Sequence, residues 1–346
     1  MAGTKTSGSL QRYLLTRLVL IIPMIWILVT LVFFLMRVIG DPITAAQGGR
    51  LPPEQIAERK HAAGFDRPIF VQYGEYLWNL LHGDFGTTLS DHRKVSDILL
   101  VNGAATLELT FWAFLIAIGV GIPLGRLAAR HRDRFPDVLL RVTGVLFYAA
   151  PVFFVGLLAK LLFANILGWL PVSGRADPTT QIAIAHVSPK TNIFIIDSIL
   201  YGDPNYILDV VRHTVLPAFT LGLLTAGIFL RLVRTNLLQT MRADYVEAAR
   251  ARGVAEGTVV RKHAFRNALV PVVTVMGLQG ALLLGGAILT ERTFEWQGLG
   301  YALASYLTSR DFVAVQGIVT VIAIFVAVVS FLIDVLTALI DPRVRY

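Results

Sequence analysis

The most informative polar residues of this chain lie together in the stretch 244–271, which reads DYVEAARARGVAEGTVVRKHAFRNALVP. Asp244 and Glu247 have the three-residue spacing of a capping box, in which two side chains accept hydrogen bonds from the free N–H groups at a helix start. Gly253 predicts the end of that helix. The pattern therefore predicts a helix of about eight residues, roughly 12 Å long. A helix this short is marginal alone in water and needs a partner surface.

The residue types of this short helix favour docking over catalysis. Ala248 and Ala249 carry almost no side-chain bulk, so a partner could approach the backbone closely. Glu247 and Arg250 could fix the register of such a contact. The alternative is a loop whose Arg and Lys residues only follow the rules of membrane topology. Pattern alone leaves both interpretations open.

Motifs of enzymatic chemistry are missing from the sequence. There is no G-x-x-x-x-G-K-[ST] phosphate loop, so this chain is not expected to bind ATP phosphates itself in the usual way. H-E-x-x-H and G-x-S-x-G are also missing, which argues against an intramembrane enzyme. The seven histidines show no i, i+4 pair and there is no cysteine, so no metal site is expected.

Composition places the chain in a membrane. Hydrophobic residues make up 55% of its 346 residues and charged residues only 16%, and the mean hydropathy is +0.65. A soluble domain has about a quarter charged residues. Six segments approach or exceed the ~20 apolar residues that cross a bilayer. They are 14–37, 104–125, 142–164, 213–233, 267–290 and 312–334.

The short connections between these segments predict the orientation, because cytoplasmic loops carry the excess of Lys and Arg. The connection 126–141 holds five Arg against two Asp, and 231–266 holds eight basic residues against three acidic ones. The other connections are near neutral or slightly acidic. Both termini and Glu247 are therefore expected in the cytoplasm. This bias also accounts for the net charge of +8, so nucleic-acid binding is not expected.

Two connections are too long for simple turns. The first, 38–103, contains an amphipathic stretch and predicts a small external subdomain of helices. The third, 165–212, is rich in Pro, Gly and Asp. Loops of this length are often functional, so a contact with a partner on the outer face is one interpretation. The alternative is that both insertions pack against the helices of this chain.

Glu247-Ala248-Ala249 followed by Gly253 resembles the EAA loop by which membrane subunits of bacterial ABC importers engage their ATPases. The positions 263–266 read His-Ala-Phe-Arg, as is usual in the peptide branch of that family. Further segments resemble the peptide and nickel importer permeases, and the first two of them resemble the B-type subunit. These segments are 17–42, 64–86, 216–222, 231–254, 263–274, 293–300 and 332–346.

The resemblance implies an all-α integral membrane protein, with six transmembrane helices in a type I ABC importer permease fold. Residues 1–37 would form a cytoplasmic tail and the first helix, and 38–103 an extracytoplasmic insertion between helices 1 and 2. Residues 104–334 would form the core, and 335–346 a cytoplasmic tail. The expected partners are a related C-type permease in a heterodimer, one or two ABC ATPase subunits that bind ATP and Mg, an extracytoplasmic substrate-binding protein and membrane lipid.

Two groups of candidate residues follow from the sequence and the resemblance. The coupling loop would act through Asp244, Glu247, Ala248, Ala249, Arg250 and Gly253. Small residues on the fifth segment permit close packing toward a partner permease or the pathway. These are Gly277, Gly280, Gly285 and Gly286. For the intramembrane charges Glu108 and Lys160, which lie within a few turns of a span end, we expect structural roles at the membrane interface.

The expected function is the transmembrane permease subunit of an ATP-driven importer of di- or oligopeptides across the bacterial cytoplasmic membrane. A passive channel is the alternative class, since six spans and a glycine-rich helix would suffice for one. A transporter of the same class that carries nickel chelates, glutathione or haem also remains open, because substrate choice in such importers rests mostly with the separate binding protein.

Overall fold

The computed structural model describes residues 6–40, 43–44, 52–62 and 64–340. Within these ranges all regular structure is helical, apart from an isolated antiparallel bridge between Thr87 and Lys94. The all-α prediction is confirmed. The outermost parts of both predicted tails, 1–5 and 341–346, lie outside the described residues.

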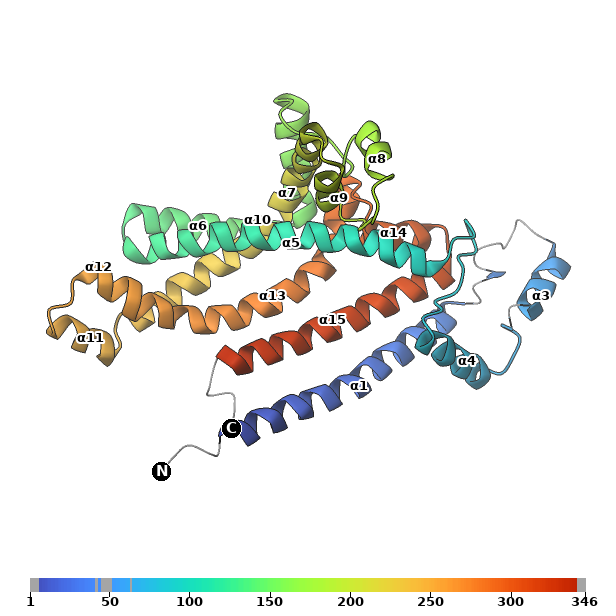
Figure 1. Cartoon of the computed structure of the whole chain (residues 1–346), viewed down its shortest axis with the longest axis horizontal. Helices are drawn as coiled ribbons and strands as arrows, with labels where there is room; N and C mark the ends of the chain where they lie inside the picture. The colour runs from blue at the N-terminus through green and yellow to red at the C-terminus, as the bar shows by residue number, and fades with distance from the viewer. Residues whose placement is uncertain (1–5, 41–42, 45–51, 63, 341–346) are drawn as a thin grey trace.

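Long apolar helices form the body of the molecule. Those long and apolar enough to cross a bilayer are α1 (Thr6–Ile39), α5 (Val95–Arg130), α10 (Pro204–Thr240), α13 (Phe265–Phe294) and α15 (Phe312–Ile340). Figure 1 shows α5, α13, α15 and α1 one below another along the long axis of the view. The 36 residues of α5 would extend roughly 54 Å, well beyond the ~30 Å of hydrocarbon. The ends of α5 and α10 therefore project out of the bilayer and carry the connecting segments.

The predicted third span, 142–164, is wrong as a single helix. It is split between α6 (Phe135–Ala149) and a second piece made of α7 (Val152–Ala159) and the π-helical turn η1 (Lys160–Ile166), which are bent by 106°. Pro151 explains the break: Ala150 before it is extended, with φ −73° and ψ 133°, as the proline ring requires. The two pieces together are apolar enough for one crossing, which would bring the number of spans to six.

A seam of small residues holds α5 against α10. A Cβ atom on Gly121 would lie 2.7 Å from the carbonyl oxygen of Ala226, and one on Gly125 would lie 2.6 Å from that of Leu230. Gly222 of α10 fits against α5 in the same way. No larger side chain fits at these positions, so the glycines set the distance between the two helices.

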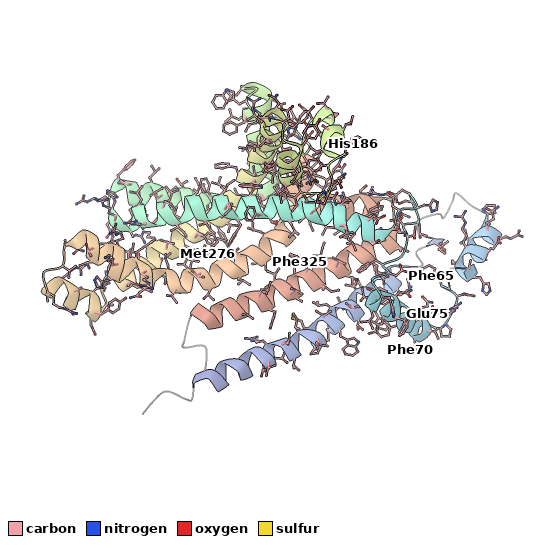
Figure 2. The ribbon with its side chains drawn as sticks, viewed as in Figure 1. Phe65, Phe70, Glu75, His186, Met276 and Phe325 are labelled. Carbon is pink, nitrogen blue, oxygen red and sulfur yellow. The ribbon has the colours of Figure 1, made fainter. Side chains whose placement is uncertain are left out.

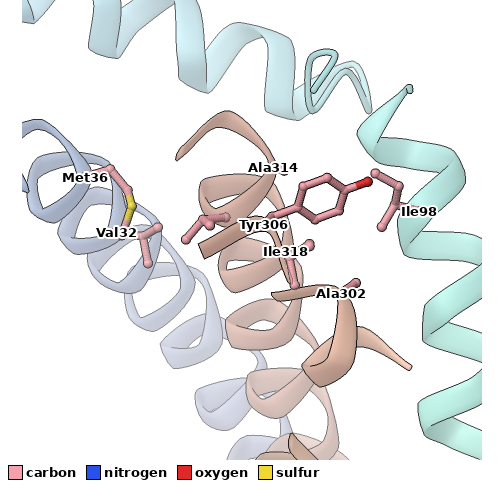
Figure 3. Packing of buried hydrophobic residues seen from close by; sticks show 8 residues of the cluster. Val32, Met36, Ile98, Ala302, Tyr306, Ala314 and Ile318 are labelled. Carbon is pink, nitrogen blue, oxygen red and sulfur yellow. The ribbon is translucent and has the colours of Figure 1, made fainter. Parts of the chain in front are cut away.

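The first span packs beside the last one. Val32 and Met36 of α1 join Ile318 of α15 in one buried cluster, as Figure 3 shows, and Tyr306 of α14 (Leu299–Thr308) completes it. The cluster also includes Ile98, which lies near the start of α5. The first and last segments of the chain therefore form one side of the bundle.

Both long connections contain helices, which the sequence predicted only for the first of them. The first holds α3 (Pro53–Ala62) and α4 (Ile69–Leu81), and the third holds α8 (Pro178–Ile184) and α9 (Phe194–Tyr201). The ring of Tyr73 on α4 lies 5.3 Å from that of Phe33 on α1, and Tyr76 Oη is 2.7 Å from Thr320 Oγ1 on α15. Helix α4 thus contacts helices of its own chain, although neither α3 nor α4 has a fully buried residue.

Candidate coupling site around helix α11

The 231–266 connection folds into a short helix at one end of the bundle. Helix α11 (Asp244–Ala251) follows α10, and α12 (Glu256–Thr258) and the π-helical turn η2 (Val259–Ala264) lead into α13. Figure 1 places α11 and α12 at one end of the long axis, opposite α3 and α4, while α8 and α9 lie above α5 between the two ends. The predicted eight-residue helix is therefore present, and it joins two bilayer-length helices.

The predicted capping box at the start of α11 is wrong. The N-cap residue is Ala243, which has no side-chain cap, and its carbonyl oxygen accepts from the N–H groups of Val246 and Glu247 at 2.9 and 3.2 Å. Because the helix begins at Asp244, that carboxylate is already one position inside and cannot cap. Asp244 and Glu247 both remain in the first turn, where negative charge is stabilised by the helix dipole.

The predicted end at Gly253 is confirmed. Gly253 is left-handed, with φ +76°. Its N–H donates to the carbonyl of Arg250 at 2.9 Å, and the N–H of Val254 donates to that of Ala249 at 3.3 Å. These two bonds form a Schellman motif, which satisfies carbonyls that the helix itself leaves free.

Two residues one turn apart anchor α11 to the bundle. Val246 and Ala249 are 0% and 3% exposed, and both belong to a buried apolar cluster at the ends of α5, α10 and α13. Its other buried members are Ala129, Leu237, Val259, Ala264 and Ala268. Ala249 therefore faces inward and is not available to a partner, contrary to the expectation from the sequence. Ala248 and Glu247 are exposed on the outer face.

Arg250 is held by its own chain. Its Nε and Nη2 donate to the two carboxylate oxygens of Glu256 at 3.0 and 2.9 Å, and Nη1 donates to the carbonyl of Met241 at 3.2 Å. The Glu256 carboxylate raises the pKa of Arg250, so the pair stays charged. Arg250 thus fixes the position of α11 relative to its two flanking turns. Its guanidinium group is therefore already bonded within this chain, whereas the sequence predicted that it would set the register of a partner.

Tyr245 is a surface residue that the sequence analysis did not single out. Its side chain is 45% exposed, and it lies one turn before Ala248 on the outer face of α11. A large aromatic ring left exposed on an otherwise polar helix is a signal for a contact surface. The outer face therefore combines an aromatic ring, a small residue and the carboxylate of Glu247.

A buried ion pair braces the same end of the bundle. Arg234 of α10 donates from Nε and Nη2 to the two oxygens of Asp137 on α6 at 2.6 and 2.8 Å. The backbone N–H of Asp133 also donates to Asp137, whose side chain is 0% exposed. Sequence reasoning counted Asp137 and Arg234 only as loop charges and did not predict their pairing.

The candidate glycines of α13 do not form a tight seam inside this chain. A Cβ on Gly280 would only touch the ring of Phe114, at 3.7 Å, and one on Gly285 would meet nothing within 4 Å. Gly277 is half-buried. The surroundings of Gly286 lie outside the described residues. Nearby, Figure 2 shows Met276 between α13 and α5, where it packs on a buried cluster formed by α5 and α10.

The two intramembrane charges have structural partners, as expected. Lys160 donates from Nζ to the carbonyl of Thr293 at 2.9 Å. Glu108 is 3% exposed and accepts from Nη2 of Arg175 at 2.6 Å and from the N–H groups of Phe194 and Ile195. Glu108 therefore ties the 165–212 connection to α5, and its expected place at the membrane interface stays a prediction.

The segment after α13 is fitted closely to α5. Trp296 is fully buried and donates from Nε1 to the carbonyl of Ala105 at 2.9 Å. Thr106 donates from Oγ1 to Glu291 at 2.7 Å. A Cβ on Gly298 would lie 2.2 Å from Oε1 of Glu291, so only glycine fits there. The segment 293–300, which resembles the importer permeases in sequence, is thus explained by its close packing against α5 and Glu291.

Comparisons with known proteins agree with this architecture. Residues 121–346 match the family described as the inner membrane component of binding-protein-dependent transport systems, and 10–110 match the N-terminal region of the same kind of component. The chain is 39% identical over 336 residues to a di/tripeptide transport system permease of Pseudomonas aeruginosa (strain UCBPP-PA14), which covers 96% of this chain and 98% of that protein.

Two further relatives have the same extent. The dipeptide transport system permease of Escherichia coli (strain K12) is 37% identical over 340 residues, which cover 97% of this chain and 99% of that protein. The glutathione transport system permease of Salmonella typhimurium (strain LT2) is 35% identical over 338 residues, with 96% and 99% covered.

The bilayer-length helices show that this chain crosses the membrane several times, and the family match shows that it is a permease, which is not itself an enzyme. More specifically, the chain belongs to the family of inner-membrane components of binding-protein-dependent transport systems. The resemblance stated from the sequence is confirmed.

Proposed function

We propose that this chain is the transmembrane permease subunit of an ATP-driven importer of di- or oligopeptides across the bacterial cytoplasmic membrane. It acts with separate ATPase subunits, a related C-type permease and an extracytoplasmic substrate-binding protein. The observation that carries this proposal is helix α11, which is anchored on its inner side by Val246 and Ala249 and leaves Glu247 exposed.

The anchoring of α11 makes it suitable for transmitting force. Its buried side touches residues from the ends of α5, α10 and α13, so a push on the exposed side reaches three long helices at once. Arg250 further joins it to the preceding and following turns. Rigid-body movement of packed helices is the expected response to such a push, because close-packed interiors transmit strain.

In this proposal α11 docks into ATPase subunits that bind ATP and Mg on the cytoplasmic side. Closure of the ATPases on ATP moves α11 together with the spans, and the pathway opens alternately to each side. Asp244, Glu247, Ala248 and Tyr245 supply the outer contact face. Ala249, Arg250 and Gly253 keep the helix in place and contribute indirectly.

The excess of Arg and Lys in 126–141 and 231–266 supports a cytoplasmic position for this end and for both termini. The opposite end, with α3, α4, α8 and α9, then faces the binding protein. Helix α13 is the candidate pathway helix, since Gly285 is exposed and open to a partner permease or to cargo. The names of the relatives support short peptides as cargo: two carry di- or tripeptides, and glutathione is itself a tripeptide.

The proposal is tested by Glu247→Arg in the assembled complex, reconstituted in vesicles with its ATPases and binding protein. We expect ATP-dependent dipeptide uptake to be lost while the amount of permease in the membrane stays the same, because reversing an exposed charge removes a contact without disturbing packing. Glu58→Arg makes the same charge change on the exposed helix α3, far from α11, and should leave the association with the ATPase subunits unchanged, whereas Glu247→Arg should weaken it.

Normal uptake in the Glu247→Arg complex would contradict the docking role. Equal cargo movement in vesicles without ATP or ATPases would favour the passive channel. Uptake of nickel chelates or haem in place of peptides would keep the transport mechanism and replace the cargo.

A further inference from the structure

Three metal-ligating side chains meet at the end of α10 that lies far from α11. Asp209 and His213 stand one turn apart on α10, and Asp177 is the residue just before α8. One ligand atom from each of the three lies within 4.8 Å of the others. Asp177 and Asp209 are already joined, because the N–H of Asp177 donates to Oδ2 of Asp209 at 2.8 Å.

The hydrogen bonds of His213 determine which ring nitrogen is free. Nδ1 lies 2.9 Å from the backbone carbonyl oxygen of Asp209 and 3.1 Å from its Oδ1. A carbonyl oxygen only accepts, so Nδ1 carries a proton. In the neutral ring, Nε2 then has an unused lone pair. Nε2 makes no hydrogen bond to any residue that the structure describes, although the side chain is only 4% exposed.

The free nitrogen is aimed at a carboxylate. His213 Nε2 lies 3.8 Å from Oδ1 of Asp177, which is too far for a hydrogen bond. When the ring is neutral, this lone pair and the carboxylate oxygen are two acceptors without a donor between them, and a metal ion would bind this deprotonated form. A cation fits between them, since bonds of roughly 2.0–2.2 Å from one ion span ligand atoms at this separation.

We propose that Asp177, Asp209 and His213 bind one divalent transition-metal cation of the zinc class. His213 Nε2 supplies the nitrogen ligand, and the two carboxylates supply oxygen. One nitrogen with two carboxylate oxygens is a donor set that Zn²⁺ accepts, with water in the remaining position. The bond from Nδ1 to the Asp209 carbonyl is the second-shell contact that orients a metal-bound imidazole.

The side chain of Asp177 is 67% exposed and provides the entry path for the ion, whereas that of Asp209 is 16% exposed. Once bound, the ion ties the segment that carries α8 to the start of α10. The sequence expectation of no metal site rested on pairs of histidines. That criterion does not detect His213, because its partners are carboxylates and one of them lies 36 positions away in the chain. The inference does not depend on the transport function.

The test uses the full-length permease in lipid nanodiscs, with its purification tag removed and with metal stripped by a chelator. Zn²⁺ is then titrated alone, bound zinc is counted after desalting, and X-ray absorption identifies its ligands. We expect one zinc per chain, with one imidazole nitrogen and the remaining ligands oxygen. Asp177→Asn should weaken binding at least about tenfold, as should His213→Gln. Asp177 is exposed and makes no side-chain cap, so this variant tests the site even if His213→Gln fails to fold.

His186→Asn is the matched control, because His186 lies in the same segment just after α8 (Figure 2), is exposed and bonds only within its own turn. It should bind zinc like the unaltered chain. Zinc should also slow proteolysis of the 165–212 segment in the unaltered chain but not in Asp177→Asn. No bound zinc in the unaltered chain, or zinc binding in Asp177→Asn and His213→Gln as tight as in the unaltered chain, would overturn the proposal. Binding without protection would overturn the tie between α8 and α10.

Discussion

At the scale of single residues, Ala248 and Ala249 are adjacent in sequence and opposite in role. Successive helical residues point about 100° apart, so one methyl group faces out while the other is 3% exposed in the apolar cluster beneath α11. Ala249→Leu should overpack that cluster and lower the free energy of unfolding by about 1–3 kcal/mol. Thermal unfolding of the purified complex in nanodiscs measures this.

Ala248→Leu is the matched substitution on the outer face. It should leave the melting temperature nearly unchanged and reduce the stimulation of ATP hydrolysis by the permease, because the added side chain keeps the ATPase surface away from the backbone. Equal thermal effects of the two substitutions would contradict the assignment of inner and outer faces.

The ion pair of Asp137 and Arg234 gives a second prediction at this scale. Asp137→Ala leaves a guanidinium that is only 16% exposed without its partner, so we expect a loss of about 2–3 kcal/mol in stability. A double-mutant cycle with Arg234→Ala should show a coupling energy of about 1–3 kcal/mol. Arg132→Ala removes an exposed pair with Asp133 and serves as the control, with an expected change below about 0.5 kcal/mol. Additive effects of Asp137→Ala and Arg234→Ala would contradict the pairing.

At the scale of elements, the end of α11 depends on one backbone conformation. Gly253 has φ +76°, where a side chain costs about 1 kcal/mol, and Gly253→Ala should lower stability by that amount. Gly257→Ala is the control, since Gly257 lies in α12 outside the left-handed region with nothing within 4 Å. Hydrogen exchange of the 244–254 amides should rise in the first variant only. Unchanged exchange there would mean that the Schellman bonds do not hold the helix end.

The α5–α10 seam gives a prediction with a control two residues away. A Cβ on Gly121 meets the Ala226 carbonyl at 2.7 Å, whereas a Cβ on Gly119 meets nothing within 4 Å. Gly121→Ala should therefore cost about 1–3 kcal/mol, and Gly119→Ala should be neutral or slightly stabilising. Melting temperatures of the two purified variants separate these outcomes. Similar values would show that α5 and α10 move apart easily.

These elements show how far sequence reasoning reaches. Apolar length located the long helices, and Gly253 located the end of α11, because both depend on local properties of the chain. The 106° break between α6 and α7 was not predicted, because hydropathy measures apolar length and not the direction of a helix. Pro151 was the available sequence signal for this break. The seam of Gly121 and Gly125 was not predicted, since composition does not tell which helix faces which. The expected contact of the α13 glycines with a partner permease or the pathway stays a prediction.

At the scale of the whole molecule, the two ends of α10 have different chemistry. One end carries α11, the paired residues Asp137 and Arg234, and the basic connections. The other carries α8 and α9, held to α5 by the buried pair of Glu108 and Arg175. Such pairs between distant segments cannot be predicted from one sequence, because each residue alone is indistinguishable from a loop charge. In the proposed function, the first is the end that couples to the ATPases and the second is the end that faces the binding protein.

The orientation of these ends can be tested directly, because the chain contains no cysteine. Single substitutions Ala248→Cys and Arg132→Cys mark the α11 end, and Lys190→Cys marks the opposite end, all at exposed positions. A membrane-impermeant maleimide should label Lys190→Cys in intact spheroplasts and the other two only in inside-out vesicles, because charged reagents do not cross the hydrocarbon. Detergent-solubilised samples of all three should label equally, which controls for reactivity. Labelling of Ala248→Cys from the outside of spheroplasts would place α11 away from ATP, and the proposed coupling would then be impossible.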